Sequence, residues 1–248
     1  MAIAMTKGYS EQTAGAKLCI DLASDWGAEC ISDLNISENV FLMDYGAADG
    51  GTASEFWGKI INDIQEKNQS TEITLIGNDL YSNDNQALIN NLSIQSINNE
   101  LVKTFLCAGS FYDQLVPSEF IDFGFSATAM HWLNKKVENL NDHTHVLASS
   151  NQTARNDFLK QALFDWNQIL DIRSKELKIG GKLLTVNLSR DNENRYLGNN
   201  GGKTVNVHDE IHSIWKELLE EKLITEAEYQ KGTIQNFYKS PEEFISPL

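Results

Sequence analysis

The apolar residues near the start of the chain recur with the spacing of a helix. Between residues 13 and 31, one face of a helical wheel carries Leu18, Cys19, Leu22 and Trp26. An apolar stripe with polar residues around the rest of the wheel is typical of a helix that packs on a core through one side. The sequence therefore predicts an amphipathic opening helix over 13–31.

A short continuous apolar run follows at Val40–Met43. Runs of this kind are typical of a parallel strand that is buried on both faces. A helical face then begins, formed by Phe56, Trp57, Ile60, Ile61 and Ile64. The sequence thus predicts a strand, a turn and a helix in this order.

The alternation continues along most of the chain. Strand-like runs occur at 72–80, 102–111, 120–133 and 182–190, and helical periodicity occurs at 157–179 and 207–224. Alternating strands and helices imply right-handed crossovers, so we expect an α/β fold with a mostly parallel sheet and helices on both faces. The polar stretch 192–203, rich in Gly and Asn, predicts a surface loop or linker.

Length and charge narrow the class of protein. With 248 residues, of which 41% are hydrophobic, the chain can bury the core of one α/β domain, or of one domain with an appended cap. Its 20 basic and 35 acidic residues give a net charge of -15, which repels phosphate backbones and anionic lipid surfaces. We therefore expect neither a nucleic-acid partner nor a membrane partner. The sequence shows no apolar run of transmembrane length and no signal-peptide pattern at its start.

The three cysteines, Cys19, Cys30 and Cys107, are widely spaced and odd in number. Their spacing matches no metal-ligand pattern, so we expect reduced thiols and no metal site. Reduced thiols favour a cytoplasmic location.

The turn after the first predicted strand has the composition of a ligand loop. In "LMDYGAADGGTASEF", Gly46, Gly50 and Gly51 allow tight turns, and small alanines keep the surface low. Ligands of open α/β sheets bind at the carboxyl ends of the strands, so a nucleotide-like group can lie here. The spacing matches neither G-x-G-x-x-G nor a P-loop. A tight turn without a ligand is the alternative.

The next two strand ends add polar and aromatic groups. The second ends in "GNDL", where Asp79 can accept two hydrogen bonds from a ribose diol, although an ordinary helix N-cap is an equal alternative. The third ends in "AGSFY", where Ser110 can bond a purine edge and Phe111 can cover an adenine face, or serve as core. Three such ends in succession favour an S-adenosylmethionine site over separate coincidences.

A family resemblance rests on six motifs in order. The stretches "MDYGAADGGT", "GNDL", "CAGSFYDQLVP", "FGFSATAMHWLN", "RSKELKIGGKLL" and "YKSPEEF" resemble the SABATH family of S-adenosylmethionine-dependent carboxyl methyltransferases. The most diagnostic parts are G-S-F-Y at Gly109–Tyr112 and H-W-L at His131–Leu133. The resemblance implies a class I methyltransferase (Rossmann-like) core over 1–191 and a partial helical cap segment over 192–248.

The resemblance also implies which residues form the site. In relatives the glycine loop lies against the methionine part of the cofactor, and a Trp holds the acceptor carboxylate. Carried over by position, the cofactor contacts are Tyr9, Thr13, Asp44, Gly46, Ala47, Asp49, Thr52, Asp79, Leu80, Ser110 and Phe111. The acceptor contacts are Gln12, Tyr112, Thr128, His131 and Trp132, of which Trp132 and His131 are the expected catalytic residues.

The chemistry of such a reaction requires little acid–base help. A carboxylic acid with a pKa near ~4 is ionised at neutral pH, so it needs no general base before it attacks a methyl group. The absence of a Ser/His/Asp or metal motif agrees with this. A structural role for Trp132 is an alternative, and His131 is either a wall residue, a hydrogen-bond partner of the acceptor, or a base for a phenol or ring nitrogen.

Three departures from the family pattern bear on function. First, Ala16 stands where relatives have a Gln that shares the carboxylate with the Trp. Second, Thr128 replaces a frequent Tyr, and Ala47 replaces a usual Cys. Third, relatives continue past "FYKSPEEFISPL", so we expect self-association as a homodimer, as in relatives, to cover an exposed sheet edge.

The sequence therefore predicts an S-adenosylmethionine-dependent enzyme that methylates the carboxylate of a small organic acid. The alternatives are a non-catalytic S-adenosylmethionine-binding protein or partner subunit, and a methyltransferase that acts on a phenol or a ring nitrogen. A nicotinamide-dependent oxidoreductase is disfavoured because G-x-G-x-x-G is missing.

Overall fold

The computed structural model describes residues 5, 7–197 and 206–248. These residues form two compact units. The first, the sheet unit, comprises the described residues up to Met130 together with Gln168–Asn187. The second unit comprises His131–Asn167 and the described residues from Leu188 to Leu248. The expected division into 1–191 and 192–248 has different bounds and stays a prediction.

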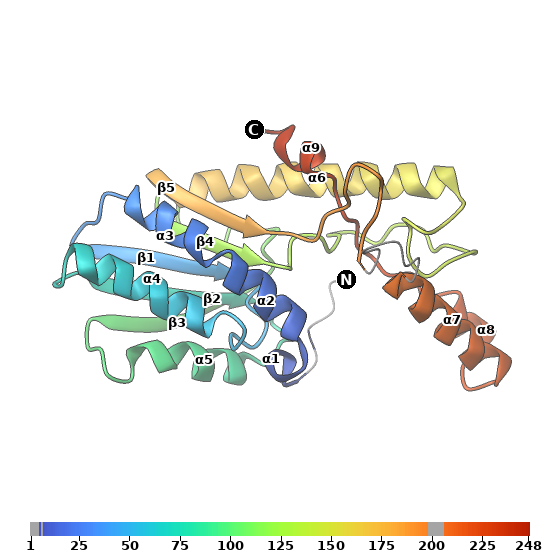
Figure 1. The fold of residues 1–248 in the computed structure, drawn as a ribbon, viewed down its shortest axis with the longest axis horizontal. Helices are drawn as coiled ribbons and strands as arrows, with labels where there is room; N and C mark the ends of the chain where they lie inside the picture. The colour runs from blue at the N-terminus through green and yellow to red at the C-terminus, as the bar shows by residue number, and fades with distance from the viewer. Residues whose placement is uncertain (1–4, 6, 198–205) are drawn as a thin grey trace. The chain divides into compact units, whose positions relative to one another are not determined.

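Five parallel strands of the described chain form one sheet in the order β3-β2-β1-β4-β5 (Figure 1). Their bounds are β1 Asn39–Tyr45, β2 Glu72–Asp79, β3 Val102–Ala108, β4 Ile121–Ala127 and β5 Leu177–Val186. Because β1 lies between β2 and β4, the chain crosses over in both directions from it, as expected for a doubly wound sheet. The predicted α/β fold is confirmed.

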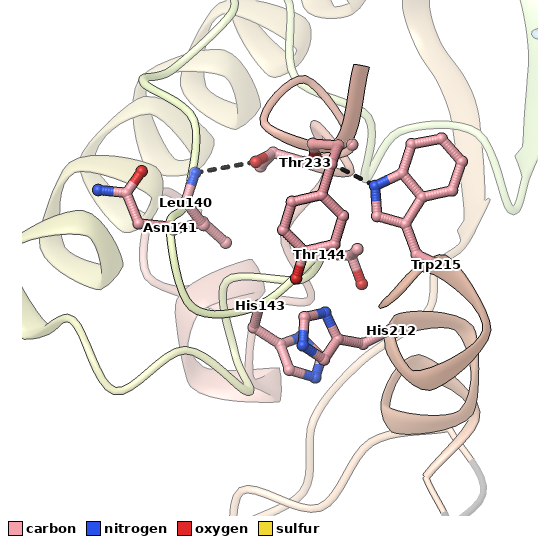
Figure 2. A pocket seen from close by; sticks show the side chains of 9 residues that line it. Leu140, Asn141, His143, Thr144, His212, Trp215 and Thr233 are labelled. Atoms are coloured by element: carbon pink, nitrogen blue, oxygen red, sulfur yellow. Dashed lines mark hydrogen bonds between the residues drawn. The ribbon is translucent and has the colours of Figure 1, made fainter. Parts of the chain in front are cut away.

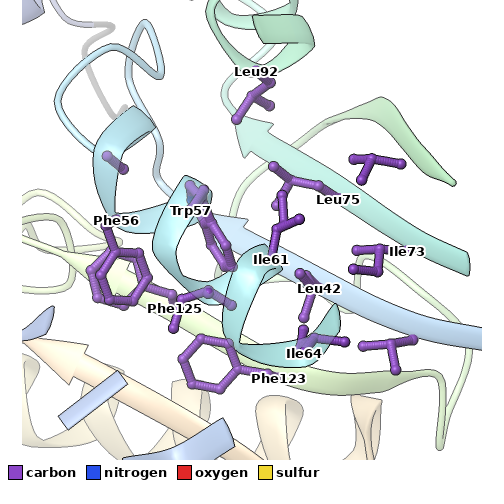
Figure 3. Close-up of a cluster of buried hydrophobic side chains, with 14 of the residues drawn as sticks. Leu42, Phe56, Trp57, Ile61, Ile64, Ile73, Leu75, Leu92, Phe123 and Phe125 are labelled. Atoms are coloured by element: carbon purple, nitrogen blue, oxygen red, sulfur yellow. The ribbon is translucent and has the colours of Figure 1, made fainter. Parts of the chain in front are cut away.

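Helix α4 (Ser54–Lys67) packs against the sheet through the apolar face that the sequence predicts. Phe56, Trp57 and Ile61 are buried against side chains of β1, β2 and β4 (Figure 3). The Phe56 ring stacks on Phe125, with 4.1 Å between the ring centroids. The other helices of this unit are α1 Tyr9–Gln12, α2 Ala14–Leu22, α3 Ser24–Ser32, α5 Asn85–Ser93 and the 3₁₀ turn Ile94–Ser96.

The predicted opening helix over 13–31 is corrected in two respects. It is two helices, α2 and α3, that meet at Ala23, and the buried positions are Ile20, Ala23, Gly27 and Ile31. The predicted apolar face is instead exposed, with Leu18, Leu22 and Trp26 at 59%, 71% and 60%. The smaller face is buried because it permits close packing: a Cβ on Gly27 would lie 2.7 Å from the Phe56 ring of α4.

The boundary between α6 (Gln152–Glu176) and β5 also differs from the one that the sequence predicts. The predicted helix over 157–179 ends at Glu176, and the strand begins at Leu177 rather than at 182. Gly180 has a φ of +83°, and the β4–β5 register shifts nearby between Ile121 and Phe123. A local bulge of this kind interrupts the strand pattern and hides its start.

The second unit is built around the first half of α6. Phe158 and Ala162 of this helix pack with Leu133, Leu140 and Phe237. The unit also contains α7 Val207–Glu220, α8 Glu226–Tyr229 and α9 Pro241–Ile245, of which α8 and α9 each begin with a capping box. Of the predicted loop 192–203, residues 198–203 lie outside the described part of the chain. No helix in the described ranges is long and apolar enough to cross a membrane.

All five histidines of the chain belong to the second unit, and four of them stack in two pairs. The rings of His145 and His208 are 3.8 Å apart between centroids with an interplanar angle of 10°. The rings of His143 and His212 are 4.3 Å apart at 24°. We call these two pairs the histidine stack. It joins the 143–145 segment to the start of α7.

The hydrogen bonding of His145 requires a neutral ring. The Nδ1 atom of His145 accepts from the Leu147 N–H, so a protonated ring would direct one N–H against another. Burial accordingly lowers the pKa of His145 to about 3 and that of His208 to about 4.

The stack should therefore lower stability in acid. Because the pKa of His208 is lower in the folded chain than its ordinary value of 6.5, the unfolded chain binds more protons between about pH 6.5 and 4, and stability falls as pH falls through this window. The change His208→Phe keeps a flat ring against His145 but cannot be protonated. Relative to wild type, its free energy of unfolding should rise by about 1–2 kcal/mol between pH 7 and pH 4.5.

Thermal unfolding of wild type and of His208→Phe at each pH gives the difference in their free energies of unfolding. Asp44 and Asp79, whose pKa values are raised, act in the opposite sense but are common to both proteins. A difference that does not change with pH would rule out the histidine stack as an acid-sensitive element.

Candidate cofactor and acceptor site

The turn after β1 is bonded to the end of β2 through its backbone. The N–H groups of Gly46 and Ala47 both donate to the Asn78 carbonyl, at 3.0 and 2.9 Å. Ala48 has a φ of 51°, in the left-handed region, and its N–H donates to the Asp79 carboxylate at 2.7 Å. A positive φ is uncommon for a residue with a Cβ and is retained where the surrounding structure requires it. Here it directs the Ala48 N–H to Asp79.

Asp79 is not the N-cap of the following helix. The cap of α5 is Asp84, whose carboxylate accepts from the Ala87 N–H at 3.1 Å. Asp79 instead accepts one bond on each oxygen, from Ala48 and from the Leu80 N–H at 2.7 Å. Two bonds leave lone pairs on both carboxylate oxygens. Asp79 can therefore still accept from a diol, as its predicted ribose role requires.

Two carboxylates without a basic partner lie at these strand ends: Asp44 is buried and Asp79 is half-buried. Burial raises the pKa of Asp44 to about 7, with a further rise from the charge of Asp79, although the Trp57 indole N–H donates to Asp44 at 2.7 Å and opposes the rise. Burial also raises the pKa of Asp79, although its two backbone N–H donors lower it. No lysine or arginine of the described residues forms an ion pair with either group. A site with this charge fits a positively charged ligand that also carries a diol.

Asp49 fixes the start of the chain against the glycine loop. One carboxylate oxygen accepts from both the N–H and the hydroxyl of Ser10, each at 2.9 Å, and the other accepts from the Gly51 N–H at 3.2 Å. These bonds fix α1, which begins at Tyr9, against the glycine loop. The Thr13 hydroxyl donates to the Tyr9 carbonyl at 2.7 Å. Asp49 and Thr52 are buried, whereas Tyr9 and Thr13 are half-buried.

The third strand end meets the first. A Cβ on Gly46 would lie 3.5 Å from the Phe111 ring and 2.6 Å from the Ala129 Cβ, so only glycine fits at this position. The Ser110 hydroxyl accepts from the Tyr112 N–H at 3.2 Å. The structure thus brings Gly46, Asp79 and Phe111 to one edge of the sheet, as the sequence predicts.

Sequence reasoning missed Asn78, although it stands directly before Asp79 in "GND". Its side-chain amide donates to the carbonyls of Cys107 and Gly109, at 2.8 and 3.0 Å, and so ties β2 to the end of β3. Its Oδ1 atom is buried without a hydrogen-bond partner. Two further asparagines brace the loop from α5 and its approach: Asn83 donates to the Ala48 carbonyl and Asn91 to that of Asp49.

The predicted acceptor residues are divided between the two units. Gln12, Tyr112 and Thr128 belong to the sheet unit, where Gln12 is exposed and Tyr112 is buried. Thr128 has a φ of 52°, which is rare for a β-branched residue, and its N–H donates to the Val186 carbonyl at 2.7 Å. Such strain is typical of functional positions.

His131 and Trp132 belong to the second unit. The His131 carbonyl accepts from the Phe237 N–H at 3.0 Å, and Trp132 forms a β-bridge with Asn236. His131 is buried, its Nδ1 atom has no hydrogen-bond partner, and burial together with the charge of Lys239 lowers its pKa to about 3. Its ring is therefore neutral at pH 7. That these two residues meet the other three at one acceptor stays a prediction.

A small pocket in the second unit contains none of the predicted site residues (Figure 2). Two of its lining atoms, Thr144 Oγ1 and His212 Nδ1, are buried without hydrogen-bond partners. The lining residues are Leu140, Asn141, His143, Thr144, His212, Trp215, Tyr229, Gly232 and Thr233. Within the described ranges, no group of three or more His, Cys, Asp or Glu residues is arranged to hold a metal ion.

The chain is similar to plant methyltransferases. It is 28% identical over 258 residues to an S-adenosyl-L-methionine:benzoic acid/salicylic acid carboxyl methyltransferase of Petunia hybrida, a match that covers 97% of this chain and 67% of that protein. It is 24% identical to the salicylate carboxymethyltransferase of Clarkia breweri, over 84% of this chain and 59% of the relative. The chain thus spans about two thirds or less of the length of these relatives.

A solved structure shares the fold. Loganic acid methyltransferase with SAH superposes with a TM-score of 0.83 at 19% identity, covering 99% of this chain and 75% of that one. The family model described as SAM dependent carboxyl methyltransferase matches residues 6–246. Because this match spans nearly the whole chain, the chain belongs to the SABATH family of S-adenosylmethionine-dependent carboxyl methyltransferases.

Proposed function

We propose that the chain transfers a methyl group from S-adenosylmethionine to the carboxylate of a small organic acid and so forms a methyl ester. The observation that carries the proposal is the pair of carboxylates at the glycine-loop edge of the sheet, the buried Asp44 and the half-buried Asp79, whose pKa values are both raised by desolvation. S-adenosylmethionine carries a ribose diol and a positive charge, which are the two features that this pair fits. Family membership supports the same cofactor and the same reaction.

Each residue has a defined part in this proposal. Asp79 accepts from the ribose hydroxyls, Phe111 and Ser110 bound the adenine, and the loop from Asp44 to Thr52 faces the methionine part. The cofactor supplies a methyl group on a sulfonium sulfur. The Trp132 indole N–H donates to the acceptor carboxylate and fixes its orientation, and positioning of this kind supplies most of the rate in such a transfer.

The pKa of His131 bears on the alternative acceptors. A phenol or a ring N–H must lose a proton before or during transfer, whereas a carboxylate is already ionised. With a pKa of about 3, His131 is a weak base and is unsuited to removing such a proton at neutral pH. It can still accept or donate one hydrogen bond as a neutral ring. This favours a carboxylate over a phenol or ring nitrogen.

The cofactor role of Asp79 can be tested by calorimetry with S-adenosylhomocysteine. The change Asp79→Ala should weaken binding by roughly 1.5–3 kcal/mol, because a charged acceptor of the ribose hydroxyls is lost. Asp84→Ala is the matched control: it removes the carboxylate that caps α5, and so should cost about 1 kcal/mol of stability but no affinity. Equal affinity in wild type and Asp79→Ala would remove Asp79 from the ribose role.

The acceptor role of Trp132 requires an identified acid, from a screen of pooled carboxylic acids with labelled S-adenosylmethionine. The change Trp132→Phe keeps an aromatic ring but removes the indole donor, so kcat/KM should fall by about 1–3 kcal/mol in transition-state free energy with little change in stability. Trp166→Phe is the control, since that indole donates to the Phe244 carbonyl, a structural bond. Ala16→Gln, which restores the residue of the relatives, should raise turnover of the acid.

If both Trp132→Phe and Ala16→Gln leave the turnover of the acid unchanged, the proposal that Trp132 holds the acceptor carboxylate is contradicted. If no pooled acid is methylated while S-adenosylhomocysteine binds, the protein is a non-catalytic cofactor binder or partner subunit instead.

We also propose a cytoplasmic homodimer. The three cysteines of the chain are all free thiols, which agrees with a reducing compartment. Exposed apolar residues that a second copy can cover include Leu22, Phe105 and Ile179. Light scattering should give twice the monomer mass of 27.8 kDa, and a monomer mass at high concentration would contradict the dimer.

A further inference from the structure

The loop that follows β3 has little regular hydrogen bonding of its own. Residues 110–116, here called loop 110–116, carry Ser110 and Phe111 and contain no helix or strand. Within the loop, the Asp113 N–H donates to the Ser110 carbonyl at 2.9 Å. Its position next to Gly46 must therefore be fixed largely from outside.

The last two turns of α6 supply these outside bonds. Gln168 donates to the Tyr112 carbonyl at 2.9 Å. Five residues further along the same helix, Arg173 donates through Nη1 to the Phe111 carbonyl and through Nη2 to the Asp113 carbonyl, each at 2.9 Å. The guanidinium thus spans two alternate carbonyls of the loop with its planar fork.

Glu176 holds the other end of the loop. Its Oε1 atom accepts from the N–H groups of Leu115 and Val116, and its Oε2 atom lies 2.9 Å from Arg173 Nε and accepts from the Tyr45 hydroxyl at 2.8 Å. The Arg173 guanidinium also lies 4.4 Å from the centre of the Tyr45 ring. Tyr45 is the last residue of β1, so the network connects the loop directly to the strand that precedes Gly46.

The ion pair between Arg173 and Glu176 is fully buried, and this limits how much it can stabilise the fold. The side chains of Arg173 and Glu176 are 1% and 0% exposed. Desolvation cancels much of the attraction in such a pair, and apolar residues of similar volume often stabilise a core as well or better. What the pair supplies that apolar residues cannot is a set of directional bonds to four backbone groups of one loop. No apolar replacement can fix the loop in this way.

We propose that Gln168, Arg173 and Glu176 are positioning residues for the cofactor: they hold loop 110–116 so that Ser110 and Phe111 stand at the adenine site. The inference rests on the proposed function, since it takes the cofactor role of these two residues from it. None of the three residues needs to touch the cofactor. They act through the backbone of the loop, from the face of the sheet opposite α4.

The change Arg173→Lys tests this role. Lysine keeps a cation beside Glu176, but its compact ammonium cannot span two carbonyls. Amide hydrogen exchange in residues 110–116 should become faster while exchange in β1 and β2 stays unchanged. The dissociation constant for S-adenosylhomocysteine should rise about tenfold, below the hundredfold that an ångström-scale misplacement can cost. The KM for S-adenosylmethionine should rise with it, and kcat at saturating cofactor should stay within about twofold.

Two further variants separate positioning from stability. Gln168→Met removes the donor to Tyr112 from a half-buried side chain of similar length, so it serves if Arg173→Lys does not fold. Ser174→Ala is the matched control, because this exposed residue of the same helical turn bonds only to the Asp171 carbonyl of its own helix. The control should leave exchange and affinity unchanged. A purely structural role would lower the unfolding temperature of the variants without changing the affinity of the folded protein.

The outcomes are distinct. If wild type binds S-adenosylhomocysteine and the folded Arg173→Lys and Gln168→Met variants bind it equally well, the positioning role is wrong and the proposed function stands. Unchanged exchange in residues 110–116 of both variants would also overturn it. If wild type binds no S-adenosylhomocysteine, the proposed function itself fails.

Discussion

The hydrogen bond from the Ala48 N–H to Asp79 is the interaction on which the cofactor side of the structure depends. It joins the first strand end to the second, and it requires Ala48 to adopt a left-handed backbone. The flanking glycines allow the chain to enter and leave this conformation, with φ values of 72° at Gly46 and 74° at Gly50. The turn is therefore shaped by the carboxylate, and the carboxylate is oriented by the turn.

This arrangement has a cost in stability. Asp44 and Asp79 are held where burial opposes their charge, and the described residues place no cation beside them. For a group whose pKa is raised in the folded state, ionisation at higher pH favours the unfolded chain, so the contribution of these two carboxylates to the stability of the ligand-free protein falls as pH rises from about 4 towards 7. A cationic ligand removes this cost when it binds. The site is thus most stable with its charge complement present, which is the usual condition of a preformed binding site.

The sequence predicts the sheet and the cofactor edge well because both depend on local signals. The α4 face is fully apolar at helical spacing, and Gly46, Asp79 and Ser110 each lie at the end of a strand or within two residues after it. The opening helix was misread because two apolar stripes compete there, and only tertiary packing selects the narrow one at Gly27. Local spacing cannot rank two such faces. Likewise, the strand start at Leu177 depends on a bulge that pairing with β4 creates.

The site residues that sequence reasoning missed are those that act through the backbone. Asn78 bonds two carbonyls of the next strand end, and Arg173 bonds two carbonyls more than 55 residues away along the chain, with separations of 62 and 60 residues. Such bonds need no particular residue type in their partner, so the partner sequence carries no trace of them. The chemistry of a binding loop can therefore be read from its own side chains, but its rigidity cannot. In this fold that rigidity comes from α6, whose first part packs within the second unit while its last turns hold loop 110–116. A change at the end of this helix is consequently expected to act first on the cofactor side, because that is where its directional bonds lie.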